Sequence, residues 1–515
     1  MFDLLIERIV PVETGGDAML LTLPELFSQL GRDTIDGFPG LAAHQAQAWY
    51  QFLAQLGALA LHRGHLREPP EDPDAWRGLL ADLTPSSAAT AWSLMVENPT
   101  RPAFLQPATG MLHKFKLAGE TPDALDVLVT AKNHDRKRAQ AIHGEPHLWL
   151  YALITLQTTQ GYSGRGNPGI ARMNGGLSSR VLVDRRPGPR WGPRVARAMR
   201  MLLVRRSEIL RFVSDDLYQS EGGLALTWLH EWDTDAPLRM EELDPFFIEI
   251  CRRVRLTATG KGRLAALARP AKIPRVAAQA LKGNLGDPWT PVNLSKSAPS
   301  SLTVGGNGFN YRLAQLILFE RKLKKPLSLK TLPGENRLDS EVHMAVLVRG
   351  QGKTEGLHER IIPLPESVAP YLQFDEDEQG SPLAALSHDM VAMAGEARKV
   401  LWQTVQIYLQ GPEHPKFRKP DAAPTIASYD RKIDKEFFNC LFEAPKIGSD
   451  EVILRWQLLL RNEAFRLARD VWHKTTPPSI RHEKARAASE AVLFAGLRKR
   501  LPEAFLEHDS KEPST

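Results

Sequence analysis

The sequence predicts an α+β protein in which a mixed, loop-rich N-terminal domain precedes an all-α C-terminal four-helix bundle. Three observations predict this class. Two short apolar runs, at residues 342–349 and 357–364, flank a glycine-rich tip and indicate a strand–turn–strand unit. Residues 285–308 are rich in Gly, Pro, Ser and Asn, which is typical of loops with short strands. Four amphipathic helical stretches then follow in series, which is the pattern of a bundle.

The N-terminal region mixes strand and helix signals. Residues 1–12 alternate between apolar and polar side chains, which favours a strand. A helix over residues 20–30 opens near Thr22, where Pro24 suits the first turn. Further helices are expected at residues 42–62, 75–83, 88–96, 146–159 and 194–213.

An acidic stretch that ends in glycine, at residues 374–380, separates this region from the helical one. We therefore expect an N-terminal domain at residues 1–375 and a bundle at residues 381–505. The bundle helices are expected at residues 382–410 and 427–442, from Asp450 onwards, and at residues 480–500, because apolar residues recur there at helical spacing. Residues 506–515 are polar, and we expect them to be a disordered tail.

The composition is that of an ordinary globular protein. The chain has 515 residues, 43% hydrophobic and 24% charged, which suits at least two domains. No run of about 18 apolar residues occurs, and the acidic N-terminus does not resemble a signal peptide, so we expect a cytoplasmic protein without a membrane span. Two cysteines, Cys251 and Cys440, are too few for a disulfide framework or an all-cysteine zinc site. We expect no metal and no cofactor.

The positive charges are concentrated in two runs. Residues 180–211 hold ten arginines and only two acids, Asp184 and Glu208. Residues 252–282 hold nine lysines and arginines and no acid. Such runs repel themselves unless a polyanion lies beside them, so they point to a phosphate backbone. A solvated basic loop is the alternative.

Glycines gather in a short segment between the helix expected at residues 146–159 and the first basic run. They are Gly161, Gly164, Gly166, Gly169, Gly175 and Gly176. The run 164–169 matches G-x-G-x-x-G, but a helix precedes it and Asn167 with Pro168 favours a turn, so a dinucleotide site is not expected. Glycine lets the backbone approach an oxygen-rich partner closely, whereas a flexible surface loop is the alternative.

An enzymatic interpretation depends on His134 and Asp135. Three His-Asp pairs occur, at 134–135, 388–389 and 508–509, but nothing in the sequence brings them together. Neither a P-loop motif nor a G-x-S-x-G elbow is present. The alternative function is therefore a metal-dependent nuclease that uses His134 and Asp135, which DNA cleavage in the presence of Mg²⁺ would reveal.

Two polar loops fit nucleic acid. Residues 131–138 are dense in hydrogen-bond donors with one acid, which suits single-stranded RNA or a phosphate bend; a salt-bridged surface loop is equally compatible. Residues 351–354 form a thin polar tip that fits a minor groove, although a plain long hairpin is the alternative.

Taken together and in chain order, several segments resemble the CasA family, the large subunit of the type I-E CRISPR Cascade complex. The opening strand at residues 4–12 and the helix entry LTLPEL at 21–26 are similar to the family's start. PAFLQP at 102–107 looks like its Pro-x-Phe-x-Gln segment, and GYSG at 161–164 with Gly175 and Gly176 resembles its glycine loop. PWTP at 288–291 and GQGKTEGLHER at 350–360 complete the set.

The resemblance implies a binding subunit that is not an enzyme. It implies a crRNA, the other Cascade subunits, target double-stranded DNA and a separate helicase-nuclease as partners, and recognition of a short protospacer-adjacent motif (PAM) in the minor groove. The bundle would help to hold the DNA. The residues implied for PAM and DNA binding are Gly161, Gly164, Arg165 and Gly166 of the glycine loop; Gln351, Lys353 and Thr354 of the strand-separating wedge; and Arg252, Arg253 and Arg275 of the second basic run. Lys132, Asn133 and His134 are implied for crRNA binding.

The sequence departs from the family in three places. Some relatives carry a cysteine cluster that suggests zinc, whereas only Cys251 lies in that region here. The glycine loop is longer by residues 167–171. Gln351 and Thr354 compete for the position of the wedge glutamine, and no single basic residue of 252–275 can be chosen as the one that enters the minor groove.

Overall fold

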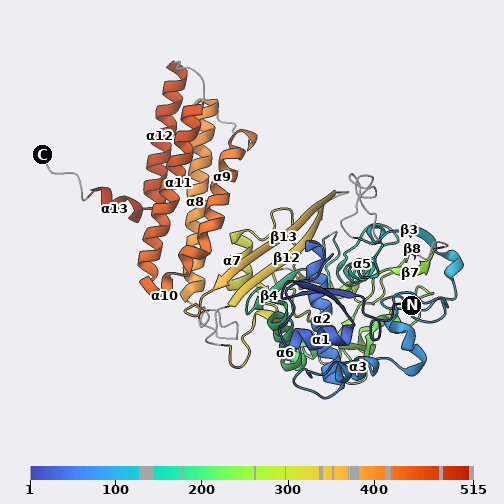
Figure 1. Ribbon diagram of the computed structural model, residues 1–515. Helices are drawn as coiled ribbons and strands as arrows, with labels where there is room; N and C mark the ends of the chain where they lie inside the picture. Colours follow the sequence, from blue (N-terminus) through green and yellow to red (C-terminus); the bar gives the residue numbers. More distant parts are fainter. Residues whose placement is uncertain are drawn as a thin grey trace. The chain divides into compact units, whose positions relative to one another are not determined.

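The computed structural model describes residues 2–126, 144–176, 178–259, 263–295, 297–335, 340–350, 353–368, 371, 382–411, 419–474 and 480–509. The chain forms two compact units (Figure 1). Unit 1 comprises Met1–Phe309 and Lys322–Leu364, and unit 2 comprises Asn310–Arg321 and Pro365–Thr515. Unit 2 therefore includes a segment that lies well before the boundary expected near residue 375. No helix in these described ranges is long and apolar enough to cross a membrane.

Unit 1 is organised around a buried helix. Its α-helices are α1 (Leu23–Gly31), α2 (Ala43–Arg63), α3 (Pro73–Ala81), α5 (Pro146–Thr159) and α6 (Trp191–Leu210). Every residue of α2 from position 47 to position 61 is buried, because α3, α5 and α6 all pack against it. Gln47, Tyr50 and Gln55 face this interior and satisfy their polar atoms by hydrogen bonds to other segments of unit 1.

The start of α1 shows how local sequence fixes a helix boundary. The Glu25 N–H donates to the Thr22 hydroxyl at 3.2 Å, and the Thr22 N–H donates to the Glu25 carboxylate at 2.9 Å. This reciprocal cap satisfies two backbone donors that a helix end otherwise leaves without a partner. The helix that we expected at Thr22 and Pro24 is confirmed.

The strands of unit 1 form small sheets. They are β1 (Val10–Thr14), β2 (Asp17–Leu21), β3 (Lys116–Gly119), β4 (Leu182–Arg186), β5 (Leu224–Leu226), β6 (Leu243–Ile248), β7 (Arg253–Ala258), β8 (Leu264–Arg269), β9 (Val292–Asn293), β10 (Ser300–Ser301), β11 (Leu323–Lys324), β12 (Ser340–Gly350) and β13 (Lys353–Leu364). Two three-stranded sheets position the candidate site, in the strand orders β13-β12-β4 and β3-β8-β7.

The hairpin predicted near residues 342–364 is confirmed, but its tip is shorter than expected. β12 and β13 pair from Ser340↔Leu364 to Gly350↔Lys353. The prediction of a glycine-rich loop over residues 350–356 is therefore wrong for residues 353–356. The ladder continues because a bulge after Val348 restores the register and Gly356 adopts a φ of +117° opposite it.

Three other expectations are corrected. The first strand begins only at Val10, because Leu4 and Leu5 turn into the core. A 3₁₀-helix at Ser86–Trp92 replaces the helix expected at residues 88–96. Helix α13 (Glu503–Asp509) covers the first part of the expected tail, since its buried Phe505 side chain anchors it. Residues 510–515 lie outside the described residues.

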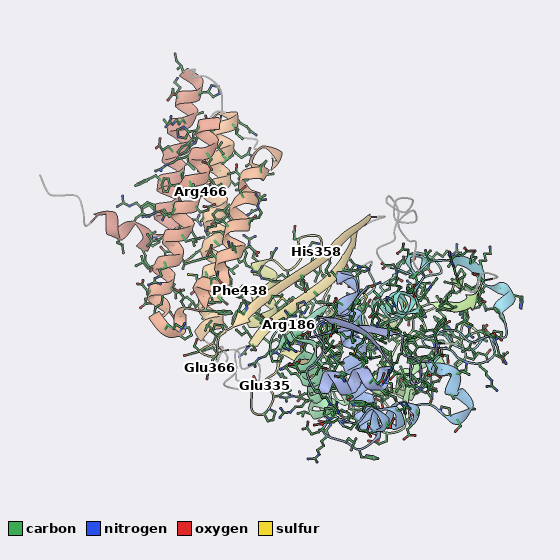
Figure 2. The ribbon with its side chains drawn as sticks, viewed as in Figure 1. Arg186, Glu335, His358, Glu366, Phe438 and Arg466 are labelled. Atoms are coloured by element: carbon green, nitrogen blue, oxygen red, sulfur yellow. The ribbon has the colours of Figure 1, made fainter. Side chains whose placement is uncertain are left out.

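Unit 2 contains the predicted four long helices, α8 (Pro382–Gln410), α9 (Lys419–Leu441), α11 (Ser449–Lys474) and α12 (Ile480–Arg500), with α10 (Ala444–Ile447) and α13. Their core is aromatic: the Phe437 and Trp456 rings lie 5.7 Å apart, and the Trp456 indole donates to the Met390 carbonyl. Phe438 and Arg466 lie on this helical unit (Figure 2). The helix α7 (Tyr311–Phe319) joins it, with the Tyr311 ring 5.1 Å from Phe437.

The first basic run is largely internal to unit 1. Six of its ten arginines are buried, namely Arg180, Arg185, Arg186, Arg194, Arg197 and Arg206. Four of them pair with carboxylates from distant positions in unit 1, among them Asp287 and Glu335. The other two bond to neutral side chains: Arg185 donates to two hydroxyl groups, and Arg194 donates to an imidazole. The expectation that this run needs an external polyanion is therefore wrong, because internal carboxylates balance much of its charge and uncharged groups of unit 1 accept hydrogen bonds from the remaining donors.

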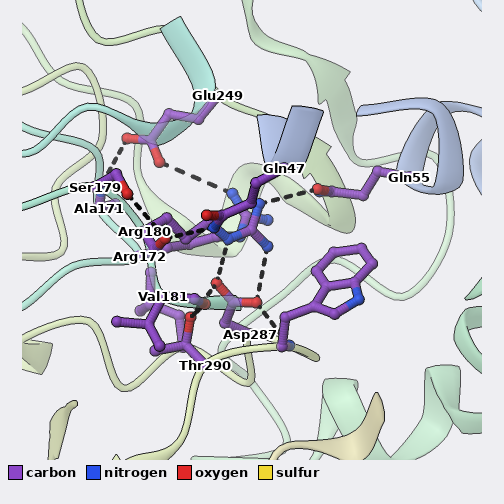
Figure 3. Close-up of polar contacts among 12 residues, drawn as sticks. Gln47, Gln55, Ala171, Arg172, Ser179, Arg180, Val181, Glu249, Asp287 and Thr290 are labelled. Carbon is purple, nitrogen blue, oxygen red and sulfur yellow. Dashed lines mark hydrogen bonds and ion pairs between the residues drawn. The ribbon is translucent and has the colours of Figure 1, made fainter. Parts of the chain in front are cut away.

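The most enclosed of these pairs joins Arg180 to Asp287. Both side chains are 2% exposed, and two parallel hydrogen bonds of 2.5 and 2.8 Å connect them (Figure 3). The Arg180 guanidinium also donates to Gln55 at 3.3 Å and lies 5.0 Å from the Trp289 ring. This arrangement fulfils the condition for a buried ion pair, in which the remaining donors also find acceptors.

We predict that Arg180→Met lowers the stability of the protein by about 3 to 5 kcal/mol, because Asp287 then remains buried without its counter-charge. Urea unfolding followed by tryptophan fluorescence measures the change. The matched control is Arg239→Met, which removes an arginine that is 69% exposed and should cost about 1 kcal/mol at most. Equal losses in the two variants would contradict the prediction.

Candidate nucleic-acid interface

The glycine-rich segment forms a closed loop that leaves the end of α5. The loop begins after Thr159, and a bridge between Gln160 and Ser179 brings its two ends together. Within it, the Ser163 N–H donates to the Asn167 carbonyl at 2.9 Å and the Asn167 N–H donates to the Gly164 carbonyl at 3.0 Å. The predicted loop is thus an ordered turn with a defined tip.

Its glycines are required by close backbone approach. A Cβ on Gly161 would lie 2.5 Å from the carbonyl oxygens of both Gly176 and Ser178. A Cβ on Gly169 would lie 2.6 Å from the Tyr162 nitrogen. Gly164 and Gly166 have φ angles of +93° and +87°, which disfavour residues with a Cβ. The two branches of the loop can therefore pack together only as glycine backbone.

The structure places Arg252, Arg253 and Arg275 in the interior of unit 1, with 8%, 3% and 1% exposure. Arg252 donates to the Pro168 and Gly161 carbonyls and so anchors the glycine loop to the interior of unit 1. Arg253 donates to the Thr234 carbonyl at 2.5 Å. Because these three side chains are buried, direct contact with nucleic acid is not expected, which corrects the prediction that they bind DNA. They instead support the glycine loop and the segments around it.

Arg275 illustrates why a buried arginine is tolerated here. It donates to the backbone carbonyls of Thr227, His230 and Glu231 and lies 5.3 Å from the Trp232 ring. Burial lowers its pKa to about 10, which still leaves it charged at neutral pH. The planar guanidinium therefore holds residues 227–231 together through several hydrogen bonds in a fixed geometry, which a lysine ammonium group does not provide.

A different set of side chains faces solvent at the loop. Tyr162 is 47% exposed, and Arg165 and Asn167 are exposed at the tip. The Ala271 N–H donates to the Gly166 carbonyl at 2.9 Å, so the exposed side chain of Lys272 belongs to the same surface. We call Tyr162, Arg165, Asn167 and Lys272 the loop-tip cluster. It presents two cations, an amide and an aromatic ring beside exposed backbone.

Several predicted site residues lie elsewhere or beyond the described ranges. Lys353 and Thr354 begin β13, opposite Gly350 and Arg349 of β12. Gln351 lies outside the described residues, as do Lys132, Asn133 and His134, together with Asp135 of the nuclease alternative. The part of the chain that the structure describes contains no group of three or more His, Cys, Asp or Glu side chains placed to hold a metal ion.

No protein-family model and no curated relative matches the sequence. Solved structures do match it over nearly the full length. Thermobifida fusca Cse1 aligns with a TM-score of 0.68 at 16% identity, covering 98% of both chains. Thermus thermophilus CasA (Cse1) gives 0.59 at 18%, covering 96% of this chain and all of that one. The chain has the Cse1 fold.

A third match comes from an assembly. A chain of a structure described as a CRISPR RNA-guided surveillance complex aligns with a TM-score of 0.51 at 13% identity, covering 96% of this chain and 99% of that one. The resemblance to CasA that the sequence suggested is thus confirmed at the level of the Cse1 fold. Both the sheet-containing part and the helical part take part in the match, since the coverage leaves neither out.

Sequence reasoning did not single out three members of the loop-tip cluster, namely Tyr162, Asn167 and Lys272. One signal could have found Lys272. In the run 252–282 the buried members Arg252, Arg253, Arg255 and Arg275 are all arginines, whereas the described lysines, Lys272 and Lys282, are exposed. Arginine suits enclosed, multiply bonded positions, and a compact, strongly hydrated ammonium group resists them.

A buried carboxylate lies behind the loop-tip cluster. Glu249 accepts from the Ala171 N–H at 2.7 Å and lies 3.8 Å from the Arg172 guanidinium, whose side chain is 5% exposed (Figure 3). Burial raises the pKa of Glu249 to about 7, in spite of Arg172 nearby. Within the glycine loop, Ala171 is therefore bonded to a carboxyl group whose pKa lies near neutral pH.

We predict that Gly161→Ala disrupts the glycine loop, because its methyl group would overlap two backbone carbonyls. Hydrogen exchange at residues 161–176 should become faster while exchange in α2 is unchanged. Gly305→Ala is the control, since a Cβ there meets nothing within 4 Å. The prediction fails if the two variants exchange alike in the loop.

We also predict a pH dependence from Glu249. Its folded-state pKa lies above the ordinary value of 4.5, so the folded state holds more protons than the unfolded state between about pH 4.5 and 7. Stability should therefore fall as the pH rises through this window, by roughly 3 kcal/mol at most, and level off above it. The variant Glu249→Gln keeps an acceptor for the Ala171 N–H. Its free energy of unfolding, measured with urea between pH 5 and 8, should not show the fall with rising pH that Glu249 causes. An identical pH profile for the two proteins would contradict it.

Proposed function

We propose that this chain is the large subunit of a type I-E CRISPR surveillance complex and that it binds the PAM of foreign double-stranded DNA. The observation that carries the proposal is the full-length match to the Cse1 fold, which extends to a chain of a CRISPR RNA-guided surveillance complex. The ordered sequence resemblance to CasA supports it independently of the fold. The protein is then a cytoplasmic binding subunit and not an enzyme.

The loop-tip cluster supplies the contact surface for DNA in this proposal. Gly164 and Gly166 are partly exposed next to Arg165 and Lys272, and because glycine has no side chain, phosphates and minor-groove edges can approach the backbone closely. Because the minor groove presents a degenerate pattern, several PAM sequences should be accepted. We assign Lys272, and not the buried arginines, as the cation that enters the DNA minor groove.

The remaining partners follow from the CasA resemblance. We propose that Gln351, together with Lys353 and Thr354 at the start of β13, forms the wedge that starts strand separation. Unstacking a base step costs a few kcal/mol, which guide pairing and backbone contacts offset. Lys132, Asn133 and His134 would hold the crRNA, unit 2 would help to hold DNA, and the marked DNA would pass to the helicase-nuclease.

The test is to express the chain together with the other complex subunits and a guide RNA. We expect guide RNA to co-purify, and we expect the complex to bind a matched duplex with a PAM more tightly than the same duplex without one. A particle that lacks RNA, or that binds both duplexes alike, would overturn the proposal.

We predict that Lys272→Glu in this complex weakens binding of the PAM duplex. The slope of log affinity against log salt concentration should flatten by about 0.9 for the lost phosphate contact, because fewer counterions are released. Filter binding over a salt series measures both quantities. Arg239→Glu, an exposed charge reversal elsewhere in unit 1, should leave the slope unchanged. If the two reversals act alike, Lys272 makes no specific contact.

A further inference from the structure

A groove on unit 1 lies between the end of α2, the segment after it and the outward face of α6. It has two adjoining lobes of about 320 and 490 Å³. Arg67, Glu68, Arg200 and Leu203 line both lobes, so they form the waist at which the lobes meet. Because the two lobes share these residues, they form one groove whose volume can hold several side chains of a ligand.

Apolar side chains line the groove from α6, from the segment after α2 and from Pro333. Leu66 is 40% exposed and Val204 is 48% exposed, and both belong to the larger lobe with Leu203. Pro69 and Pro333 line the smaller lobe. Isolated exposed leucines and valines are common on protein surfaces, but here they gather in one concavity. An occupant would therefore remove apolar area from water on both walls.

The waist is positively charged. Arg67 and Arg200 are both exposed, and neither forms an ion pair with any residue that the structure describes. Arg200 is steadied by donation to the Pro333 carbonyl at 3.0 Å. Glu68 is the carboxylate that lines both lobes, whereas Glu335 of the smaller lobe is paired with Arg197, so Arg67 and Arg200 leave a net positive charge where the lobes join.

We propose that this groove binds a short segment of a partner protein in which a carboxylate lies between two apolar side chains. The carboxylate pairs with Arg67 and Arg200 at the waist, and the apolar side chains enter the two lobes. A bidentate bond from arginine to carboxylate gives direction, and apolar burial gives affinity. The apolar lining and Glu68 disfavour a phosphate backbone. The inference does not depend on the proposed function.

The experiment selects peptides from a random library displayed on phage, with the full-length protein immobilised. We expect enriched peptides to share an Asp or Glu flanked by Leu, Ile, Phe or Met. Fluorescence anisotropy with a synthetic enriched peptide then compares the wild type with Arg67→Glu/Arg200→Glu and with Val204→Asp. Each variant should bind at least about tenfold more weakly. Arg239→Glu is the matched control and should bind as the wild type does.

Exchanging the acid of the peptide for lysine provides a charge-swap test. The lysine peptide should bind the wild type poorly and should regain affinity for Arg67→Glu/Arg200→Glu, an outcome that misfolding cannot mimic. The proposal is overturned if no peptide is enriched over bare beads, if enriched peptides lack the acid, or if the variants bind unchanged. It is also overturned if duplex DNA displaces the peptide and binds through the same two arginines.

Discussion

The buried pair of Arg180 and Asp287 connects parts of unit 1 that are far apart in the sequence. Arg180 bonds through its backbone to the end of α5 and to Gln47 of α2, while its guanidinium reaches Asp287 and Gln55. One residue therefore fixes the exit of the glycine loop, the central helix and the loop that carries Trp289. Enclosed charges are costly unless all their donors are satisfied, so this junction permits few alternative arrangements. The geometry of the loop-tip cluster depends on it.

The helices were the part of the fold most accessible to sequence reasoning. Residues 146–159 and 382–410 match α5 and α8 at both ends, because amphipathic or continuous apolar patterns end there at recognisable stops. Helix α7 was not predicted, although α1 and α3 are equally short and were. The Asn310 side chain caps its start, and it packs on α8 and α9. Strands β7 and β8 were hidden inside a basic run, since their pairing is a tertiary property that charge does not reveal.

Sequence reasoning anticipated the glycine loop better than it anticipated the surroundings of the arginines. Glycine composition alone placed the loop, because close backbone contacts such as that of Gly161 with Gly176 leave no choice of residue. The arginines of the two basic runs led to a wrong prediction of DNA contacts. The residue type does not reveal whether the counter-charge comes from a partner molecule or from elsewhere in the chain. Arg252 carries the charge expected of a DNA contact, yet it donates its hydrogen bonds to backbone carbonyls of the glycine loop.

The inclusion of Asn310–Arg321 in unit 2 gives the chain an unusual covalent layout. The backbone passes between the units at three points, near residues 309, 321 and 364. Neither unit can therefore be excised as a single uninterrupted polypeptide. A fragment that starts at residue 365 would expose the Phe437 surface that Tyr311 covers, and a protease cut between residues 321 and 322 would sever a connection without releasing either product. Evolutionary exchange of the helical unit between proteins would have to carry two separate insertions at once.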